Sequence, residues 1–354
     1  MNKTQPEKLN QEEKLRKQIN SHYERLGFAD LMKKDGVTEI CINEEGIIFY
    51  EQSSIWHKKE CPNNHSDTLI SGLGTLLINH LKQNQKFDKN NPMLSQTMPD
   101  GERVQLVIPP AAEHASLTVR IPSKQVFSME QYADFGLFEQ IEQINSISDE
   151  DKELKELLNQ KKFRLFLEKA VDYRKNILVS GATGSGKTTF MKTLISLIDP
   201  NERIITIEDA RELFIDHKNK VHLVYPKNKK DENEKVTAKS CLEATLRMKP
   251  DRIILAEVRG DEAFYFIRAC SNGHSGSMTS CHADSALMAY EQLALMVSAS
   301  KDVAGLSYGV IKHLIMMTID ISIHFANIKG KRFITGIDFE PERKLKLLRG
   351  EKLD

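Results

Sequence analysis

The chain has 354 residues, and its 50 basic and 50 acidic side chains give a formal net charge of zero at pH 7. A balanced charge argues against a general positive field that would bind nucleic acid or an acidic membrane surface. The five cysteines are widely spaced and form no CxxC pair, which favours reduced cytosolic thiols and disfavours a zinc site. No apolar run is long enough for a membrane span, and the charged amino-terminal segment is unlike a signal peptide. We therefore expect a cytoplasmic protein of two domains.

The first third of the chain has the pattern of a compact α+β unit. Alternating and apolar runs, together with one stripe of leucines and isoleucines at helical spacing, predict four strands and a helix. The predicted elements are a hairpin at residues 38–42 and 47–50, a helix at 66–81, and strands at 103–108 and 116–121. After a proline at position 122 the composition becomes rich in turn-forming residues. We therefore predict an N-terminal α+β domain at residues 1–122 and a linker region at residues 123–148.

The rest of the chain alternates strand-like and helical segments. The predicted strands are at residues 177–179, 203–207, 221–224 and 252–256, the predicted helices are at 149–171, 188–195, 238–248 and from 261 onward, and a hairpin at 319–326 and 332–339 follows. Such alternation is typical of a mostly parallel sheet covered on both faces by helices. We therefore predict an α/β fold for a second domain at residues 149–354.

A phosphate-binding loop stands between the strand at 177–179 and the helix that follows it. Residues 181–188 read GATGSGKT and match the pattern GxxxxGK[ST] at every defined position, in the strand, loop and helix context that it requires. The glycines let backbone N–H groups surround a phosphate, Lys187 supplies a charge for the β- and γ-phosphates, and the Thr188 hydroxyl is placed for Mg²⁺. The predicted nucleotide-binding residues are Gly181, Ala182, Thr183, Gly184, Ser185, Gly186, Lys187, Thr188 and, less directly, Thr189. A chance glycine-rich turn is the alternative, and the context disfavours it.

Two acidic positions follow predicted strands, where such a site needs a carboxylate to hold a metal ion or orient the attacking water. Glu257 comes directly after the buried pattern RIILA, and we interpret it as the water-activating or metal-associated acid. Glu208 begins an acidic cluster with Asp209 and Glu212, and we interpret Glu208 as a catalytic or Mg²⁺-linked residue with Asp209 as its helper. A helix cap or an ion pair remains the alternative for each position.

Two histidines and two arginines complete the candidates. His274 and His282 lie in a segment of small, turn-forming residues that suits a close approach to phosphate, although a structural role remains open for each. Arg103 and Arg120 lie in predicted strands of the first domain, where their charge needs a partner. That partner is either a nucleotide phosphate reached across the domain cleft or, as the residues alone favour, a surface ion pair.

Four segments in order resemble the motifs of the secretion ATPases, the superfamily that serves type II secretion, type IV secretion and type IV pili. They are GATGSGKT, ITIEDARE, RMKPDRIILAEVRG and NGHSGSMTSCHADS. In the first domain, LSQTMPDGERVQLVIPPA and ASLTVRIPS resemble the conjugation-type branch that serves type IV secretion. The resemblance spans residues 37–282. It departs from the pattern at Ala256, where glycine is common.

The resemblance implies a RecA-like P-loop ATPase domain with a smaller N-terminal domain, a hexameric ring, and ATP bound between domains. It identifies residues 181–188 as Walker A, Glu208 as the acidic-box position, Glu257 as the Walker B glutamate, His274 and His282 as the histidine box, and Arg103 and Arg120 as arginines directed at the γ-phosphate. The catalytic residues are then Lys187, Glu208, Glu257, His274 and His282, and the metal-associated residues are Thr188, Glu208 and Glu257, with ATP and Mg²⁺ as cofactors.

The implied function is ATP hydrolysis that powers type IV secretion, through pilus assembly or substrate translocation across the inner membrane. The implied partners are the other copies of a homo-hexamer, inner-membrane components of the channel and other ATPases of the system. The protein is then cytoplasmic and peripheral to the inner membrane, without sequence-specific nucleic-acid binding. A type II secretion or pilus motor and a nucleotide-switched scaffold with little turnover are the alternatives. The sequence leaves open whether each N-terminal domain lies on its own ATPase domain or on a neighbour's.

Overall fold

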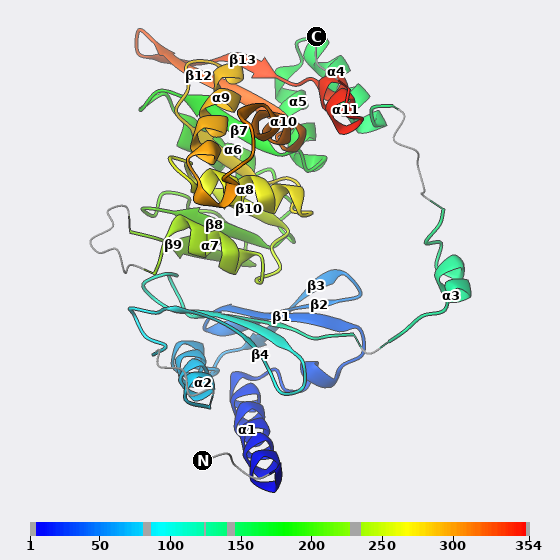
Figure 1. The fold of residues 1–354 in the computed structure, drawn as a ribbon, viewed down its shortest axis with the longest axis vertical. Helices are drawn as coiled ribbons and strands as arrows, with labels where there is room; N and C mark the ends of the chain where they lie inside the picture. The colour runs from blue at the N-terminus through cyan, green and yellow to red at the C-terminus, as the bar shows by residue number, and fades with distance from the viewer. Residues whose placement is uncertain (1–4, 81–85, 124, 140–145, 227–234, 352–354) are drawn as a thin grey trace.

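The computed structural model describes residues 5–80, 86–123, 125–139, 146–226 and 235–351, and contains two separate sheets (Figure 1). One sheet belongs to the first third of the chain and the other to the last half. The predicted linker region includes residues 124 and 140–145, which lie outside the described residues. Among the residues described, no helix has the length and apolarity needed to cross a membrane.

The first sheet has six antiparallel strands in the order β3-β2-β1-β6-β5-β4. Its strands are β1 (Val37–Glu44), β2 (Gly46–Gln52), β3 (Ile55–Cys61), β4 (Met93–Thr97), β5 (Arg103–Val107) and β6 (Ser116–Arg120). The helices α1 (Gln5–Leu26) and α2 (Ser66–His80) contribute to its core, and the short helix η1 (Leu31–Lys33) precedes β1. In α2 the buried residues Leu69, Leu73 and Leu77 recur every four positions, which explains the predicted apolar stripe.

The second sheet has seven strands in the order β13-β12-β7-β11-β10-β8-β9. They are β7 (Ile177–Gly181), β8 (Ile204–Glu208), β9 (Lys220–Val224), β10 (Arg252–Leu255), β11 (Met278–Cys281), β12 (Ile321–Ile328) and β13 (Lys331–Asp338). All neighbouring pairs are parallel except the β12–β13 hairpin. The central strand β7 is buried along its whole length, as a strand covered on both faces must be. The prediction of a mostly parallel sheet is confirmed.

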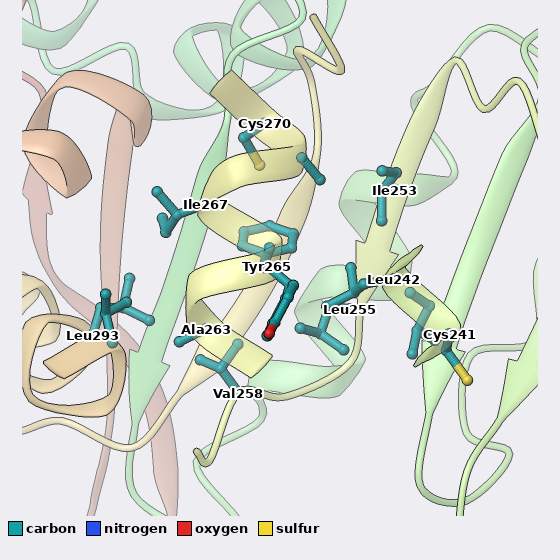
Figure 2. Packing of buried hydrophobic residues seen from close by; sticks show 14 of the residues in the cluster. Cys241, Leu242, Ile253, Leu255, Val258, Ala263, Tyr265, Ile267, Cys270 and Leu293 are labelled. Carbon is teal, nitrogen blue, oxygen red and sulfur yellow. The ribbon is translucent and has the colours of Figure 1, made fainter. Parts of the chain in front are cut away.

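Helices cover both faces of this sheet. On one face lie α4 (Asp149–Asn159), α5 (Phe163–Asp172) and α6 (Lys187–Ile195), and on the other α7 (Ala238–Thr245), α8 (Glu262–Ser271), α9 (Ala286–Ser298) and α10 (Tyr308–Thr318), with η2 (Lys301–Val303) and α11 (Pro341–Leu348) near the ends. Figure 2 shows α8 packed against β10 and α7 through buried side chains that include Ile253, Leu255 and Leu242. The segment at 149–171 is helical as predicted, but it is divided into two helices, because Lys161 adopts a left-handed conformation with φ of 58°.

The N-terminal domain lies against the β9 edge of the second sheet (Figure 1). The Val224 backbone N–H donates to the Ala111 carbonyl at 2.9 Å, and Ala112 forms an isolated bridge with Leu223. The segment that leaves the domain includes the helix α3 (Met129–Asp134), which stands apart from both sheets. The contact with β9 therefore joins the N-terminal domain to the second sheet of the same chain.

Candidate nucleotide-binding site

The loop between β7 and α6 has the backbone that phosphate binding requires. Gly181, Gly184 and Gly186 have φ angles of 147°, 74° and 103°, a region that side chains with a Cβ rarely adopt. A Cβ at Gly181 would also lie 2.3 Å from the Phe325 carbonyl oxygen. The loop ends at the first residue of α6, so the backbone N–H groups of that helix terminus face the same space. Four of the residues that the sequence assigns to the site are exposed: Ala182, Thr183, Gly184 and Thr189.

Lys187 lies buried at the start of α6 and bends back over the loop. Its Nζ donates to the Gly181 carbonyl at 2.7 Å and to the Ala182 carbonyl at 3.0 Å. Burial lowers the pKa of Lys187 from its ordinary value. The hydroxyl of Ser185 is buried without a hydrogen-bond partner among the described residues. A phosphate oxygen would give the Lys187 ammonium a charged partner in place of the two neutral carbonyls, and such a charged pair is the stronger interaction.

Glu257 emerges just after β10 and lies next to the loop through His282. The His282 Nε2 is 2.8 Å from Glu257 Oε1, and its Nδ1 is 3.2 Å from the Gly181 carbonyl oxygen. Arg259, which the sequence analysis did not single out, contacts Glu257 Oε2 at 2.8 Å and Asp209 Oδ2 at 2.5 Å. The hydrogen bond to Glu257 raises the pKa of Arg259 above its ordinary value. One imidazole thus connects the acid of β10 to the phosphate loop, and one guanidinium connects it to the acidic segment after β8.

Glu208 is fully buried at the end of β8 and holds the turn that follows. Its Oε2 accepts the backbone N–H groups of Glu212 at 2.6 Å and Leu213 at 2.9 Å. Its Oε1 has no hydrogen bond to any described residue and lies 3.9 Å from His222 Nδ1. Burial lowers the pKa of His222 to about 4, so this imidazole is neutral at pH 7. No helix begins in the described segment directly after β8, so a helix cap does not explain Glu208 or Asp209.

His274 lies at the amino edge of the second sheet, where the amino ends of its parallel strands meet. His282 lies at the carboxyl edge, where their carboxyl ends meet. The four residues of β11 separate them, with His274 before the amino end of the strand and His282 after its carboxyl end. The His274 Nδ1 is 3.2 Å from the carbonyl oxygen of Pro250, which precedes β10. Burial lowers the pKa of His274. The structure therefore brings His282, and not His274, to the phosphate loop.

Arg103 and Arg120 also lie away from the loop of their own chain. Arg120 Nε is 3.6 Å from Glu39 Oε1, and Arg103 stands opposite Arg120 in the register of β5 and β6. Glu39 is close enough to Arg203 and Lys249 for their charges to act on its pKa, and these two residues precede β8 and β10. Both arginines therefore lie in the first sheet, near the amino edge of the second, whereas the phosphate loop follows the carboxyl end of β7.

The model of the type II/IV secretion system protein family matches residues 68–322 of the chain. The type IV secretion system protein VirB11 of Brucella suis is 40% identical over 344 residues, which cover 94% of this chain and 94% of the relative. The PtlH protein of Bordetella pertussis is 36% identical and covers 82% of this chain and 86% of the relative. The chain belongs to the type II/IV secretion system protein family. Its fold is similar to the crystal structure of the VirB11 ATPase from the Brucella suis type IV secretion system in complex with sulphate.

That structural match has a TM-score of 0.86 at 38% identity and covers 92% of this chain and 99% of the other. The predicted resemblance to the secretion ATPases, and to their type IV secretion branch, is confirmed. The predicted combination of a RecA-like ATPase domain with a smaller N-terminal domain is confirmed as well.

Proposed function

We propose that this chain hydrolyses ATP to power type IV secretion, as its family membership supports. The observation that carries the proposal is the connection of the phosphate loop to Glu257 through His282, with contacts of 3.2 and 2.8 Å. A γ-phosphate held by the loop would lie beside a carboxylate and an imidazole, which is the arrangement that hydrolysis requires. The domain division at residues 1–122, 123–148 and 149–354 belongs to the same proposal.

Each residue of the site has a distinct proposed role. Lys187 binds the β- and γ-phosphates, for which it gives up its two carbonyl acceptors. Glu257 orients the attacking water, and His282 holds Glu257 in place and contacts the γ-phosphate. Glu208 has a proposed catalytic or Mg²⁺-linked role. Its Oε1, which has no hydrogen bond to a described residue, lies on the sheet face that carries α6. Its other oxygen fixes the segment that carries Asp209.

We propose Mg²⁺ as the second cofactor. The described residues hold no cluster of three or more acidic, histidine or cysteine ligands, which fits an ion that takes few protein oxygens and several from phosphates and water. The Thr188 hydroxyl on α6 and the carboxylates of Glu257 and Glu208 would supply those oxygens. Bound there, Mg²⁺ would neutralise charge on the phosphates and help to orient them.

We propose a homo-hexamer in which Arg103 and Arg120 act on the nucleotide of a neighbouring subunit. In the structure both lie at the edge of the sheet opposite to the phosphate loop, so they do not reach the loop of their own chain. A head-to-tail ring places one edge of each subunit against the other edge of the next. The two arginines would then bring charge-assisted hydrogen bonds to the neighbour's γ-phosphate.

The proposed partners are inner-membrane components of the secretion channel and other ATPases of the same system. The proposed location is the cytoplasm, at the periphery of the inner membrane. The balanced charge supports no sequence-specific nucleic-acid contact. Pilus assembly and substrate translocation are both compatible with a motor of this kind.

The experiment that tests the motor compares ATP turnover by the wild type with that of the Lys187→Ala and Glu257→Gln proteins, each also analysed by size-exclusion chromatography with light scattering. We expect turnover only in the wild type and a ring of about 240 kDa, six times the 40.4 kDa chain. ATP binding and assembly without wild-type turnover, even with membranes present, would support the scaffold alternative. A wild type without nucleotide binding would refute the proposal.

A mixing experiment tests the action between subunits. Lys187→Ala and Arg120→Ala are each expected to be inactive as homo-oligomers. Rings assembled from both proteins contain interfaces at which an intact Lys187 meets an intact Arg120 of the next subunit, so we expect turnover to reappear. Action within one chain predicts that the mixture stays as inactive as its components.

A further inference from the structure

The β12–β13 hairpin lies beside the phosphate loop on the side away from Glu257. β12 pairs in parallel with β7 up to Phe325, which is the register partner of Gly181. The Phe325 ring lies 4.7 Å from the ring of Phe190 on α6, measured between centroids. The hairpin continues beyond this point to residues 328 and 331, so its outer part extends past the end of β7.

Arg332, in the second strand of the hairpin, lies against the end of the loop. A Cβ added at Gly186 would lie 2.9 Å from Arg332 Cδ and 3.5 Å from its Nε. The stem of the arginine therefore lies over the residue that precedes α6, in the space that a larger side chain at Gly186 would need. Its register partner Asn327 stands on the same face of the hairpin, two residues from Phe325.

The electrostatic surroundings of Arg332 call for an anion. Arg332 is exposed and forms no side-chain hydrogen bond or ion pair within the part of the chain that the structure describes. It lies over Gly186, next to the amino end of α6, which carries the positive end of the helix dipole. Positive charges gathered in this way repel one another, and a bound anion reverses the sign of that contribution.

We propose that Arg332 binds the α- and β-phosphates of the nucleotide, an inference that rests on the proposed ATP site. The sheet order places β7 between β12 on one side and β11 and β10 on the other. His282 and Glu257 follow β11 and β10, so the γ-phosphate lies on their side of the loop. Arg332 approaches from the opposite side and faces the part of the nucleotide that ATP and ADP share. A guanidinium suits this contact because it can donate two parallel N–H groups to phosphate oxygens.

The test measures the affinity of the full chain for ATP, ADP and inorganic pyrophosphate by isothermal titration calorimetry. It compares the wild type with Arg332→Ala, Arg332→Lys and the control Lys331→Ala, whose side chain leaves the other face of the same strand. We expect Arg332→Ala to weaken all three ligands by about tenfold or more, the effect of losing a charge-assisted hydrogen bond. Arg332→Lys should fall in between, and Lys331→Ala should stay within about twofold of the wild type.

Three results would overturn the inference while leaving the ATP site intact. Unchanged affinities in Arg332→Ala would remove the contact altogether. A loss for ATP but not for ADP would move it to the γ-phosphate, and a loss for the nucleotides but not for pyrophosphate would move it to the base or ribose. A wild type that binds none of the three ligands is a failure of the proposed function instead. Thermal unfolding of each variant shows that it folds like the wild type.

Discussion

The carboxyl and amino edges of the seven-stranded sheet differ in how exposed their charged side chains are. At the carboxyl edge, Lys187, Glu257 and His282 surround the phosphate loop with short contacts that a ligand can replace, and the His282 side chain is 48% exposed. At the amino edge, where the N-terminal domain packs, the guanidinium of Arg203 is completely buried. Charged side chains thus serve a candidate site at one edge and a domain interface at the other.

At the amino edge, the buried Arg203 forms its hydrogen bonds within the protein. Arg203 Nε donates to the Met248 carbonyl at 2.8 Å, and its Nη1 donates to the side-chain oxygens of Asn43 at 2.9 Å and Asn219 at 2.5 Å. Its backbone N–H donates to Asp251 at 2.7 Å. Because Asn43 belongs to β1, these bonds tie the two sheets of one chain together.

The difference indicates which parts of the molecule move together. A buried network held by several hydrogen bonds favours one arrangement, so we expect the N-terminal domain and the sheet it contacts to move as a single body. The carboxyl edge lacks such closure, and we expect its contacts to change when nucleotide binds. In the proposed ring, motion would therefore occur between the phosphate loop of one chain and the amino edge of the next.

The strongest test of this comparison is removal of the buried arginine. We expect Arg203→Ala to lower the free energy of unfolding by about 3–5 kcal/mol, because it leaves the Asn43 side-chain oxygen and the Met248 carbonyl without this donor in a buried site and removes one of the two donors to Asn219. Thermal and urea unfolding measure it. The matched control is Arg164→Ala, whose exposed ion pair with Glu168 should contribute less than about 1 kcal/mol. Equal effects in the two variants would remove the distinction between the edges.

Substitution of the two histidines gives the next test, because one histidine lies at each edge of the sheet. We expect His282→Gln to reduce ATP turnover on the order of 100-fold, because Glu257 loses the imidazole that connects it to the loop. His274→Gln leaves that connection intact and should stay within about twofold of the wild type. Steady-state turnover at saturating ATP measures both. A reversed order would place the active histidine at the amino edge.

The carboxyl edge was predictable from the sequence because its constraints are local. The three glycines of the loop, Lys187 and the strand and helix around them are contiguous, and the backbone angles follow from the residue types. The separation of His274 from His282 was not predictable in the same way. The strand β11 between them has only four residues, and its sequence MTSC has no β-branched apolar residue to mark it.

The amino edge was not predictable because its partners are distant in sequence. Arg203 reads as an ordinary polar start of a strand, and nothing near it announces Asn43, which is 160 residues away. The strands β3 and β4 were missed for a related reason. Both lie at the edges of the first sheet, and the exposed residues of β3 lack the apolar alternation by which buried strands are detected.

A buried acid at the amino edge gives a pH-dependent test. Desolvation raises the pKa of Glu39 from 4.5 to about 7, and the charge of Arg120 only partly opposes this. The native state therefore favours the protonated form, so Glu39 lowers stability as the pH rises from about 4.5 through about 7. We expect Glu39→Gln to be more stable than the wild type at pH 8 by roughly 1–3 kcal/mol, and equally stable at pH 4.5. Thermal unfolding at the two pH values measures the difference. A variant that is less stable at pH 8 would mean that the ion pair with Arg120 dominates.

The smallest effect tests whether the amino edge is one network or several separate contacts. Trp56 Nε1 donates to Asp251 at 2.9 Å, and its ring lies 5.9 Å from the Arg203 guanidinium carbon. We expect Trp56→Phe alone to destabilise by about 1–2 kcal/mol. Because the Trp56 ring contacts the Arg203 guanidinium, the same change in an Arg203→Ala background should have a clearly smaller effect, measured as a double-mutant cycle in urea. Additivity within about 0.5 kcal/mol would show that the contacts are independent, and the N-terminal domain would then be free to separate from β8 and β9 in steps.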